Sequence, residues 1–240
     1  MKNLLSEGAK TLDISLNDVQ LDNFMKYMDL LLEWNENVNL TAITEPREVI
    51  TKHFLDSLTA LSLIPDGASV ADIGCGAGFP GLPLKLARDD IKLTLLDSLA
   101  KRINFLNAVI AETGLSGVEC VHSRAEDAGQ DKRYREKFDV AVSRAVASLP
   151  VLLELVLPFI KVGGVFCAYK SSLEADTNNK ESELSKSVNA LILTSPFLEV
   201  VAVSRYSPSI KMSKFCLPFS FPSSRIICFL VWVMSTSIGV

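Results

Sequence analysis

The stretch D-I-G-C-G-A-G-F-P-G, residues 72–81, decides the fold of this chain of 240 residues. It follows a short apolar run, residues 68–71, that is typical of a buried strand. Pro80 and Pro83 fall where a helix would begin, and the first turn of a helix tolerates proline. A strand, a glycine turn and a helix N-terminus bring backbone N–H groups close to a ligand, and glycine lacks the side chain that would block this approach. The stretch therefore predicts a ligand-binding turn.

The spacing of these glycines fits two classes of ligand. Gly76, Gly78 and Gly81 match G-x-G-x-x-G, the fingerprint of dinucleotide-binding proteins. Counted from Gly74, however, the order is D-x-G-x-G-x-G behind the acidic strand end at Asp72. That order resembles motif I of the class I S-adenosylmethionine-dependent methyltransferases. The glycine spacing alone leaves both ligands open.

Beyond this turn, strands and helices are predicted to alternate. Short apolar runs predict strands at residues 91–97, 118–121, 138–142 and 163–170, and helical spacing predicts helices at residues 100–113 and 150–160. This alternation indicates an α/β fold with a parallel sheet and right-handed crossovers. Ligands of such sheets bind outside the carboxyl ends of the strands. The charged residues expected at those ends are Asp72, Asp97, Glu126, Arg144 and Lys170.

Asp97 ends the predicted strand that follows the glycine turn. In nucleoside-binding sheets, an acid at the tip of the second strand accepts hydrogen bonds from both ribose hydroxyls. An acid at a strand end is common by chance, but its separation from the glycine turn fits such a sheet. Asp97 is therefore a candidate cofactor ligand.

Two helices are predicted before the glycine turn. Ser15 is a candidate N-cap for an amphipathic helix whose apolar side chains recur at helical spacing over residues 21–32. Pro46 opens a second helix that runs through His53 to about residue 63. These helices predict an N-terminal extension that packs against the rest of the chain.

We expect two domains on this basis: an N-terminal helical cap over residues 1–65 and a methyltransferase-like domain over residues 66–240. The composition of the second changes from about residue 195, beyond which serine, proline and apolar residues prevail. A polar helix is expected at residues 176–193 and a last strand at residues 225–233. That strand is too short to span a bilayer.

Composition narrows the class of protein. The net charge of −4 and the absence of an apolar segment after Met1 favour a soluble, cytoplasmic protein. Five cysteines without a C-x-x-C pair fit a reducing compartment. The two histidines, His53 and His122, form no zinc-binding spacing, so we expect neither a metal nor a membrane as partner.

Five motifs, standing in one order, resemble a single bacterial family. They are W-N-E-N-V-N-L-T (34–41), H-F-L-D-S-L (53–58), D-I-G-C-G-A-G-F-P-G-L-P-L (72–84), L-L-D-S-L-x-K-R (95–102) and S-R-A-V-A-S-L (143–149). Together they are similar to the RsmG family, also called glucose-inhibited division protein B, over about residues 12–170. The chain departs from the family at its C-terminal end, where a basic tail is missing and only S-R-I-I (224–227) resembles the last family strand.

This resemblance implies a class I, Rossmann-like fold and a methyltransferase that uses S-adenosylmethionine to modify N7 of a guanosine in 16S ribosomal RNA. Carried over residue by residue, it implies cofactor contacts at Gly74, Phe79, Ala125, Glu126 and Arg144. The partner would be 16S ribosomal RNA or the small ribosomal subunit, and we expect the protein to act as a monomer.

The expected chemistry needs few catalytic side chains. N7 of guanine carries an in-plane lone pair and no proton, so methyl transfer requires alignment and electrostatic support rather than a general base. Arg144 is the best catalytic candidate because it would reach both cofactor and base. Asn39, His53 and Lys170 are weaker candidates for substrate binding, and His53 is equally well explained as a locally bonded helix residue.

The acidic net charge is unusual for an enzyme that acts on RNA, because neutralising phosphates supplies much of the affinity. Two local basic clusters reduce this conflict: Lys101 with Arg102, and the group of Lys132, Arg133, Arg135 and Lys137. Two alternatives stay open from the residues alone, an NAD-dependent dehydrogenase and a non-catalytic RNA-binding protein of the same fold. The first lacks a convincing second catalytic domain.

Overall fold

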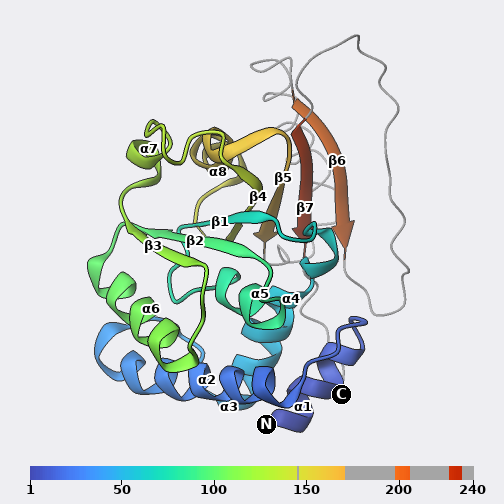
Figure 1. Ribbon diagram of the computed structural model, residues 1–240, viewed down its shortest axis with the longest axis vertical. Coiled ribbons are helices and arrows are strands. Elements are labelled where there is room, and N and C mark those ends of the chain that lie inside the picture. The colour runs from blue at the N-terminus through green and yellow to red at the C-terminus, as the bar shows by residue number, and fades with distance from the viewer. Residues whose placement is uncertain (145, 171–197, 206–226, 234–240) are drawn as a thin grey trace. The chain divides into compact units, whose positions relative to one another are not determined.

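The computed structural model describes residues 1–144, 146–170, 198–205 and 227–233 (Figure 1). The chain divides into two compact units, residues 1–128 and residues 129–240, called here the first and second units. Each unit contains parallel strands connected through helices or longer segments, as the alternating sequence pattern predicts.

The first unit consists of a helical segment followed by three strands with their connecting helices. Its elements are α1 (Lys2–Lys10), α2 (Asp18–Val38), α3 (Pro46–Glu48), the π-helix η1 (Val49–Leu55), α4 (Asp56–Leu58), the 3-10 helix η2 (Leu61–Leu63), β1 (Ser69–Ile73), α5 (Gly81–Ala87), β2 (Lys92–Asp97), α6 (Ala100–Thr113), β3 (Val118–His122) and α7 (Ala125–Ala128). The strands lie in the order β3-β2-β1.

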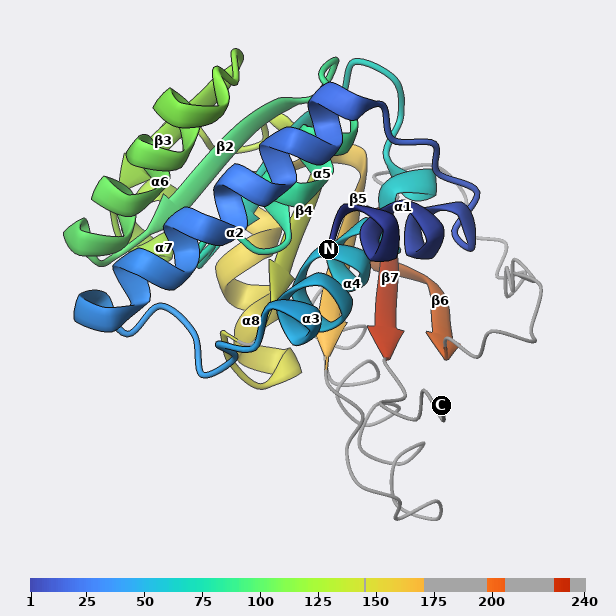
Figure 2. The ribbon, with the colours of Figure 1, turned by 90° about the horizontal axis from the view of Figure 1, so that it is seen from below.

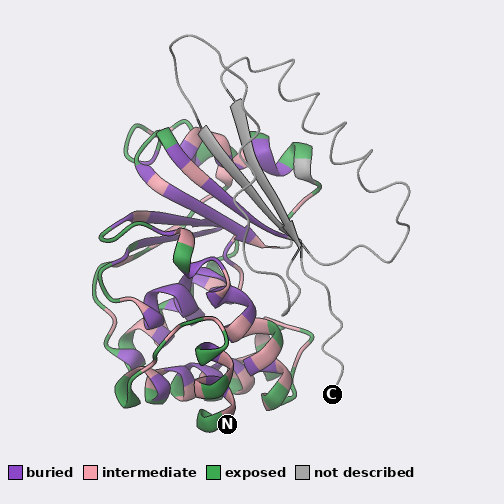
Figure 3. Ribbon diagram, turned by 90° about the vertical axis from the view of Figure 1, so that its right-hand side faces the viewer, coloured by how far each residue is buried: buried purple, intermediate pink, exposed green. Residues whose placement is uncertain are grey.

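The register of these strands brings their carboxyl ends together. Ile73 of β1 pairs with Leu96 of β2, and Asp97 of β2 pairs with His122 of β3, all in parallel. β1 and β2 are buried over almost their whole length, whereas β3 has only half-buried and exposed residues (Figure 3). The glycine turn, the end of β2 and the segment after β3 therefore leave the sheet at the same edge.

The start of α2 differs from the sequence-based prediction. The N-cap is Asn17, whose side chain accepts a hydrogen bond from the backbone of Gln20 at 2.9 Å, while the Gln20 side chain accepts one from the backbone of Asn17 at 2.9 Å. Ser15 was expected to cap this helix, and that prediction is wrong. Asn17 caps the helix instead, because Gln20, three residues further on, completes a reciprocal capping box with it.

The buried face of α2 packs on the helices that flank the sheet of the first unit. The helix lies along α6 and α5 (Figure 2), and its buried residues are Leu21, Phe24, Tyr27, Met28 and Leu31. Phe24 and Tyr27 contact the ring of Phe54 from η1, with centroid distances of 5.0 and 5.4 Å. The N-terminal helices and the glycine turn thus belong to one compact unit, and the division at residue 65 stays a prediction.

The second unit has four described strands in the order β4-β5-β7-β6, all parallel. Its elements are β4 (Phe138–Arg144), α8 (Leu149–Val156), the 3-10 helix η3 (Leu157–Phe159), β5 (Ile160–Lys170), β6 (Leu198–Arg205) and β7 (Ile227–Val233). β7 confirms the last strand expected at residues 225–233, whereas β6 was not predicted. The helix expected at residues 176–193 lies outside the described residues.

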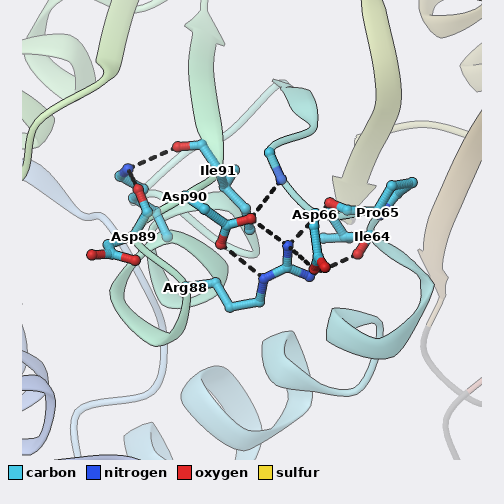
Figure 4. A network of polar contacts seen from close by, with 9 residues as sticks. Ile64, Pro65, Asp66, Arg88, Asp89, Asp90 and Ile91 are labelled. Atoms are coloured by element: carbon cyan, nitrogen blue, oxygen red, sulfur yellow. Dashed lines mark hydrogen bonds and ion pairs between the residues drawn. The ribbon is translucent and has the colours of Figure 1, made fainter.

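A polar network ties together the loops that precede β1 and β2 (Figure 4). The Arg88 guanidinium donates to the carbonyl oxygens of Ile64 and Pro65 at 2.7 and 3.0 Å. It also forms two hydrogen bonds with the carboxylate of Asp90, at 3.0 and 2.6 Å. The backbone N–H of Gly67 donates to the same carboxylate at 2.6 Å. Arg88 therefore holds the amino ends of both strands in register, opposite the edge that carries the glycine turn.

Arg88→Met is expected to lower the free energy of unfolding by about 2 kcal/mol, because two backbone carbonyls lose a charged donor. Arg88 and the Gly67 N–H also hold the pKa of Asp90 well below its usual value. The stability gained from this shift is present above the ordinary pKa of about 4 and is lost as the pH falls toward the folded-state pKa. Urea denaturation should therefore show a larger loss of stability on acidification below about pH 4 in the parent than in Arg88→Met. Equal acid sensitivity would contradict this role.

Candidate functional site

The turn after β1 needs glycine for two different reasons. Gly74, Gly76 and Gly78 have φ angles of 71°, 59° and 95°. Residues with a Cβ atom rarely adopt such angles. At Gly78 space is also lacking, because an added Cβ would lie 2.6 Å from Leu82 Cδ1 and 2.8 Å from the Tyr27 hydroxyl oxygen. The structure confirms the tight turn that the glycine spacing predicts.

The backbone N–H groups of this turn are largely directed into the fold. Those of Gly74 and Cys75 both donate to the carbonyl oxygen of Leu96 in β2, at 2.9 and 3.0 Å. Those of Gly78 and Phe79 donate to the carbonyl oxygen of Cys75, at 2.7 and 3.1 Å. These four donors are used within the fold, so they do not form the amide cradle that binds a pyrophosphate.

Two buried carboxylates accept hydrogen bonds from further N–H groups of the turn. Asp97 is 2% exposed and accepts a hydrogen bond from Gly76 at 2.9 Å. Asp72 is fully buried and accepts one from Gly81, the first residue of α5, at 2.7 Å. The turn is therefore closed by two acidic side chains, Asp72 near the end of β1 and Asp97 at the end of β2.

The two carboxylates give the turn a negative electrostatic potential. Burial raises the pKa of the Cys75 thiol well above its usual value, and the charges of Asp72 and Asp97 raise it further. Cys75 is therefore a neutral packing residue rather than a nucleophile. The same potential favours a cationic ligand and opposes a phosphate.

The segment after β3 is held against the end of β2. The Ser123 N–H donates to the carbonyl oxygen of Asp97 at 3.2 Å, and the Nε2 atom of His122 lies 3.0 Å from the carbonyl oxygen of Ser98. After Arg124, Ala125 and Glu126 open α7 with a half-buried and an exposed side chain. The first unit thus brings the predicted residues Gly74, Asp97, Ala125 and Glu126 to one edge, while their contacts with a cofactor stay predictions.

The ring of Phe79 faces an aromatic cluster instead of solvent. It is 5% exposed and stacks on Tyr27 and His53, with centroid distances of 5.3 and 4.4 Å. The Tyr27 hydroxyl donates a hydrogen bond to the carbonyl oxygen of Ala77 within the turn. Sequence reasoning missed Tyr27, because a tyrosine in the apolar face of a helix is normally a packing residue. A cofactor contact of Phe79 stays a prediction.

His53 is positioned through the asparagine-rich segment at the C-terminal end of α2. Its Nε2 atom lies 2.8 Å from Thr41 Oγ1. The side-chain oxygen of Asn35 accepts hydrogen bonds from the backbone N–H groups of Leu40 and Thr41, at 2.7 and 2.8 Å. Asn39 is the C-cap of α2 in the left-handed conformation, with an exposed side chain. The motif W-N-E-N-V-N-L-T therefore places His53 beside the turn, and substrate binding by Asn39 and His53 stays a prediction.

Tyr27→Phe tests the link between α2 and the turn. The change removes one hydroxyl and leaves the buried Ala77 carbonyl without this donor. We expect a loss of about 1–2 kcal/mol in the free energy of unfolding, with the ring packing retained. Equilibrium urea denaturation measures this loss, and an unchanged midpoint and slope would show that the hydrogen bond contributes nothing.

Arg144 and Lys170 belong to the second unit, where they end neighbouring strands. Arg144 is the last residue of β4, is half-buried, and pairs in register with Tyr169 of β5. Lys170 follows Tyr169 as the last residue of β5. Both residues therefore lie at the carboxyl edge of that sheet, as predicted, and their roles toward cofactor and RNA stay predictions.

Within residues 1–144, 146–170, 198–205 and 227–233, no group of three or more histidine, cysteine, aspartate or glutamate side chains is arranged to hold a metal ion. Among the same residues, no helix has the length and apolar character needed to cross a bilayer.

Comparison with known proteins identifies the family. The family model described as GidB, rRNA small subunit methyltransferase G, matches residues 20–199. A relative from Alkaliphilus oremlandii named Ribosomal RNA small subunit methyltransferase G is 56% identical over 172 residues, which are 71% of this chain and 72% of that protein. A relative of the same name from Desulforamulus reducens is 51% identical over 189 residues, 78% of each chain.

The match to the family model includes the glycine turn, β2 and the segment after β3, and it agrees with the parallel α/β architecture of each unit. The chain therefore belongs to the GidB family of rRNA small subunit methyltransferase G and has the Rossmann-like fold of the class I S-adenosylmethionine-dependent methyltransferases.

Proposed function

We propose that this chain transfers a methyl group from S-adenosylmethionine to N7 of a guanosine in 16S ribosomal RNA. Membership of the GidB family and the names of its relatives support the reaction class. One observation supports the cofactor most directly: the glycine turn closes on two buried carboxylates, Asp72 and Asp97, instead of presenting free amides. In this proposal the protein acts as a cytoplasmic monomer on 16S ribosomal RNA or on the small ribosomal subunit.

The hydrogen bonds of the turn support S-adenosylmethionine over a dinucleotide as the cofactor. A dinucleotide requires backbone donors for its pyrophosphate, and Gly74, Cys75 and Gly78 direct theirs to carbonyl groups of the protein. S-adenosylmethionine carries no phosphate, and its sulfonium supplies the electrophilic methyl group. The negative potential of Asp72 and Asp97 suits a positive charge, and Asp97 would accept hydrogen bonds from the ribose hydroxyls.

The protein's work in this reaction would be alignment. Guanine N7 has a lone pair in the ring plane and no proton to remove, so no side chain has to act as a general base. The rate should then be nearly flat across neutral pH. Arg144 would contact both the cofactor and the base, which makes it a positioning and electrostatic residue rather than an acid or base.

Substrate binding would involve Asn39, His53 and Lys170. His53 stacks on Phe79 of the glycine turn, Asn39 is the C-cap of α2, and Lys170 ends β5. The basic cluster of residues 132–137 is largely exposed, and the Arg133 guanidinium stacks over the Tyr134 ring at 5.2 Å while pairing with Asp131. The positive charges of such a cluster suit binding to RNA phosphates. The N-terminal segment 1–65 would act as a cap of the 66–240 domain.

Calorimetry with S-adenosylmethionine and with NAD tests the cofactor. Binding of the first and not of the second supports the proposal, whereas binding of NAD alone would return the chain to the dehydrogenase alternative. Transfer of a labelled methyl group onto purified small subunits then tests the enzyme against a non-catalytic RNA-binding protein. Binding of RNA without transfer would favour the latter.

A second substrate tests the acceptor atom. Replacing the target guanosine by 7-deazaguanosine removes N7 and leaves the Watson–Crick edge intact. We expect loss of methylation with retained binding, and full methylation of the substituted RNA would exclude N7. The target base has to leave a stack for its edge to meet the sulfonium, so fully paired RNA should be a poor substrate.

A further inference from the structure

The strongest unexplained contact at the strand tips is an ion pair within the first unit. Arg102, in the first turn of α6, places its Nη1 atom 3.2 Å from Oδ2 of Asp97. The Asp97 side chain is only 3% exposed, whereas that of Arg102 is 33% exposed. A cation in the first turn opposes the helix dipole, so this position is not explained by helix stability.

The hydrogen bonds of Asp97 leave little room for two more donors. Its Oδ2 atom accepts from Gly76 at 2.9 Å and from Arg102, and its Oδ1 atom accepts from the Leu99 N–H at 2.9 Å. A carboxylate offers about four acceptor positions, two on each oxygen. Three are therefore in use, and a single position is left for the two hydroxyls of a ribose.

The three donors differ in how readily they can move away from the Asp97 carboxylate. Gly76 and Leu99 donate from the backbone, one within the glycine turn and one at the N-cap of α6, so neither moves without a change in the fold. Arg102 donates from a flexible, partly exposed side chain across the longest of the three contacts. Asp97 would still be stabilised without it, by two backbone donors and the positive end of α6.

We propose that Arg102 is a displaceable counter-ion of Asp97, which leaves the carboxylate when the cofactor's ribose binds there with both hydroxyls. This inference rests on the proposed function, because it requires an adenosine cofactor at Asp97. It adds a residue that lowers cofactor affinity without contacting the transferred group. Breaking the ion pair consumes part of the binding free energy of the ribose, for substrate and product cofactor alike.

This role has a kinetic consequence for the reaction. Product release limits the turnover of many enzymes, and a competing cation at the ribose site would speed the departure of S-adenosylhomocysteine. Without Arg102, product inhibition should therefore be stronger.

The test compares two matched variants by calorimetry with S-adenosylhomocysteine. Arg102→Met removes the guanidinium and retains much of the aliphatic chain. Lys101→Met removes the same charge from the neighbouring exposed position in the same helical turn. We expect Arg102→Met to bind about three- to fivefold more tightly than the parent, the range of a partly exposed ion pair, and Lys101→Met to stay within about twofold of the parent.

The 2′-deoxy analogue of S-adenosylhomocysteine sharpens the comparison. With one hydroxyl, the remaining acceptor position of Asp97 suffices, so Arg102 need not leave and the advantage of Arg102→Met should disappear. A gain of equal size with both ligands, or no gain with S-adenosylhomocysteine, would overturn the inference. In the parent protein, NMR of the arginine side chains supplies an independent measurement that needs no variant: rotation of the Arg102 guanidinium should become faster when S-adenosylhomocysteine is added. Unchanged rotation would show that the ion pair persists.

A different set of results would refute the proposed function itself. If the parent binds no S-adenosylhomocysteine, or if Asp97→Asn binds it as tightly as the parent, no ribose is held at Asp97, and both the proposed cofactor site and the role of Arg102 are refuted. If Asp97→Asn weakens binding while Arg102→Met binds like the parent, the cofactor site stands and only the displacement of Arg102 is refuted.

Discussion

Gly78→Ala is expected to lower the free energy of unfolding by about 3 kcal/mol or more, because the new Cβ has neither the backbone angles nor the space it needs. At a φ of 95° an alanine is strained, and its Cβ would lie within 3 Å of Leu82, Tyr27 and Leu106 side-chain atoms. These side chains come from α5, α2 and α6. A shift that moves the new Cβ away from one of these helices therefore brings it closer to another. Equilibrium urea denaturation measures the loss.

Gly114→Ala is the matched control for this prediction. Gly114 has a φ of 67° as the C-cap of α6, and an added Cβ would meet no atom within 4 Å. The control therefore isolates backbone strain, for which about 1 kcal/mol is expected. Equal losses in the two variants would show that crowding between the turn and the three helices is unimportant.

Asp97→Ala is expected to weaken cofactor binding by about 100-fold or more, since each charge-assisted hydrogen bond to the ribose contributes about 1.5–3 kcal/mol. The change also removes the acceptor for the Gly76 and Leu99 N–H groups, which shape the turn and the start of α6. Calorimetry with S-adenosylmethionine measures the affinity. If the carboxylate binds the ribose, a 2′-deoxy analogue should lose much less affinity toward the variant than toward the parent.

Asp90→Ala provides the control for Asp97→Ala. Asp90 also accepts a backbone N–H, that of Gly67, and pairs with an arginine, but it lies before β2 rather than at its end. We expect Asp90→Ala to reduce stability and to leave cofactor affinity unchanged. Equal losses for the 2′-deoxy analogue in the parent and in Asp97→Ala would mean that Asp97 does not contact the ribose.

Much of the local structure follows from the sequence. The helix expected at residues 100–113 is α6 with the same bounds, and the strand expected at residues 118–121 is β3 with one more residue. Short apolar runs between glycine, proline and acidic residues leave few alternatives to a buried strand, so these elements are determined locally. Family membership also follows from motifs that the sequence displays directly.

The expected helix at residues 46–63 shows where local signals are insufficient. It forms as α3, the π-helix η1, α4 and η2 in succession. The wider turn of η1 carries Phe54 and His53, whose rings pack on Phe24 and Phe79 from distant parts of the first unit. A π-helix allows such packing at the expense of regular α-helical hydrogen bonding. No local residue pattern predicts it.

The sequence by itself determined the α/β class, the glycine turn and the acid at the end of β2, because each depends on residues close together in the chain. Only the tertiary structure decided how the site is built from them. The Tyr27 hydroxyl reaches Ala77 across 50 residues, and the Gly76 N–H reaches Asp97 across 21. Such contacts form only when the parallel strands align and α2 packs beside the turn, so the inward-facing amides and the occupied Asp97 carboxylate follow from the packed fold rather than from any local sequence pattern.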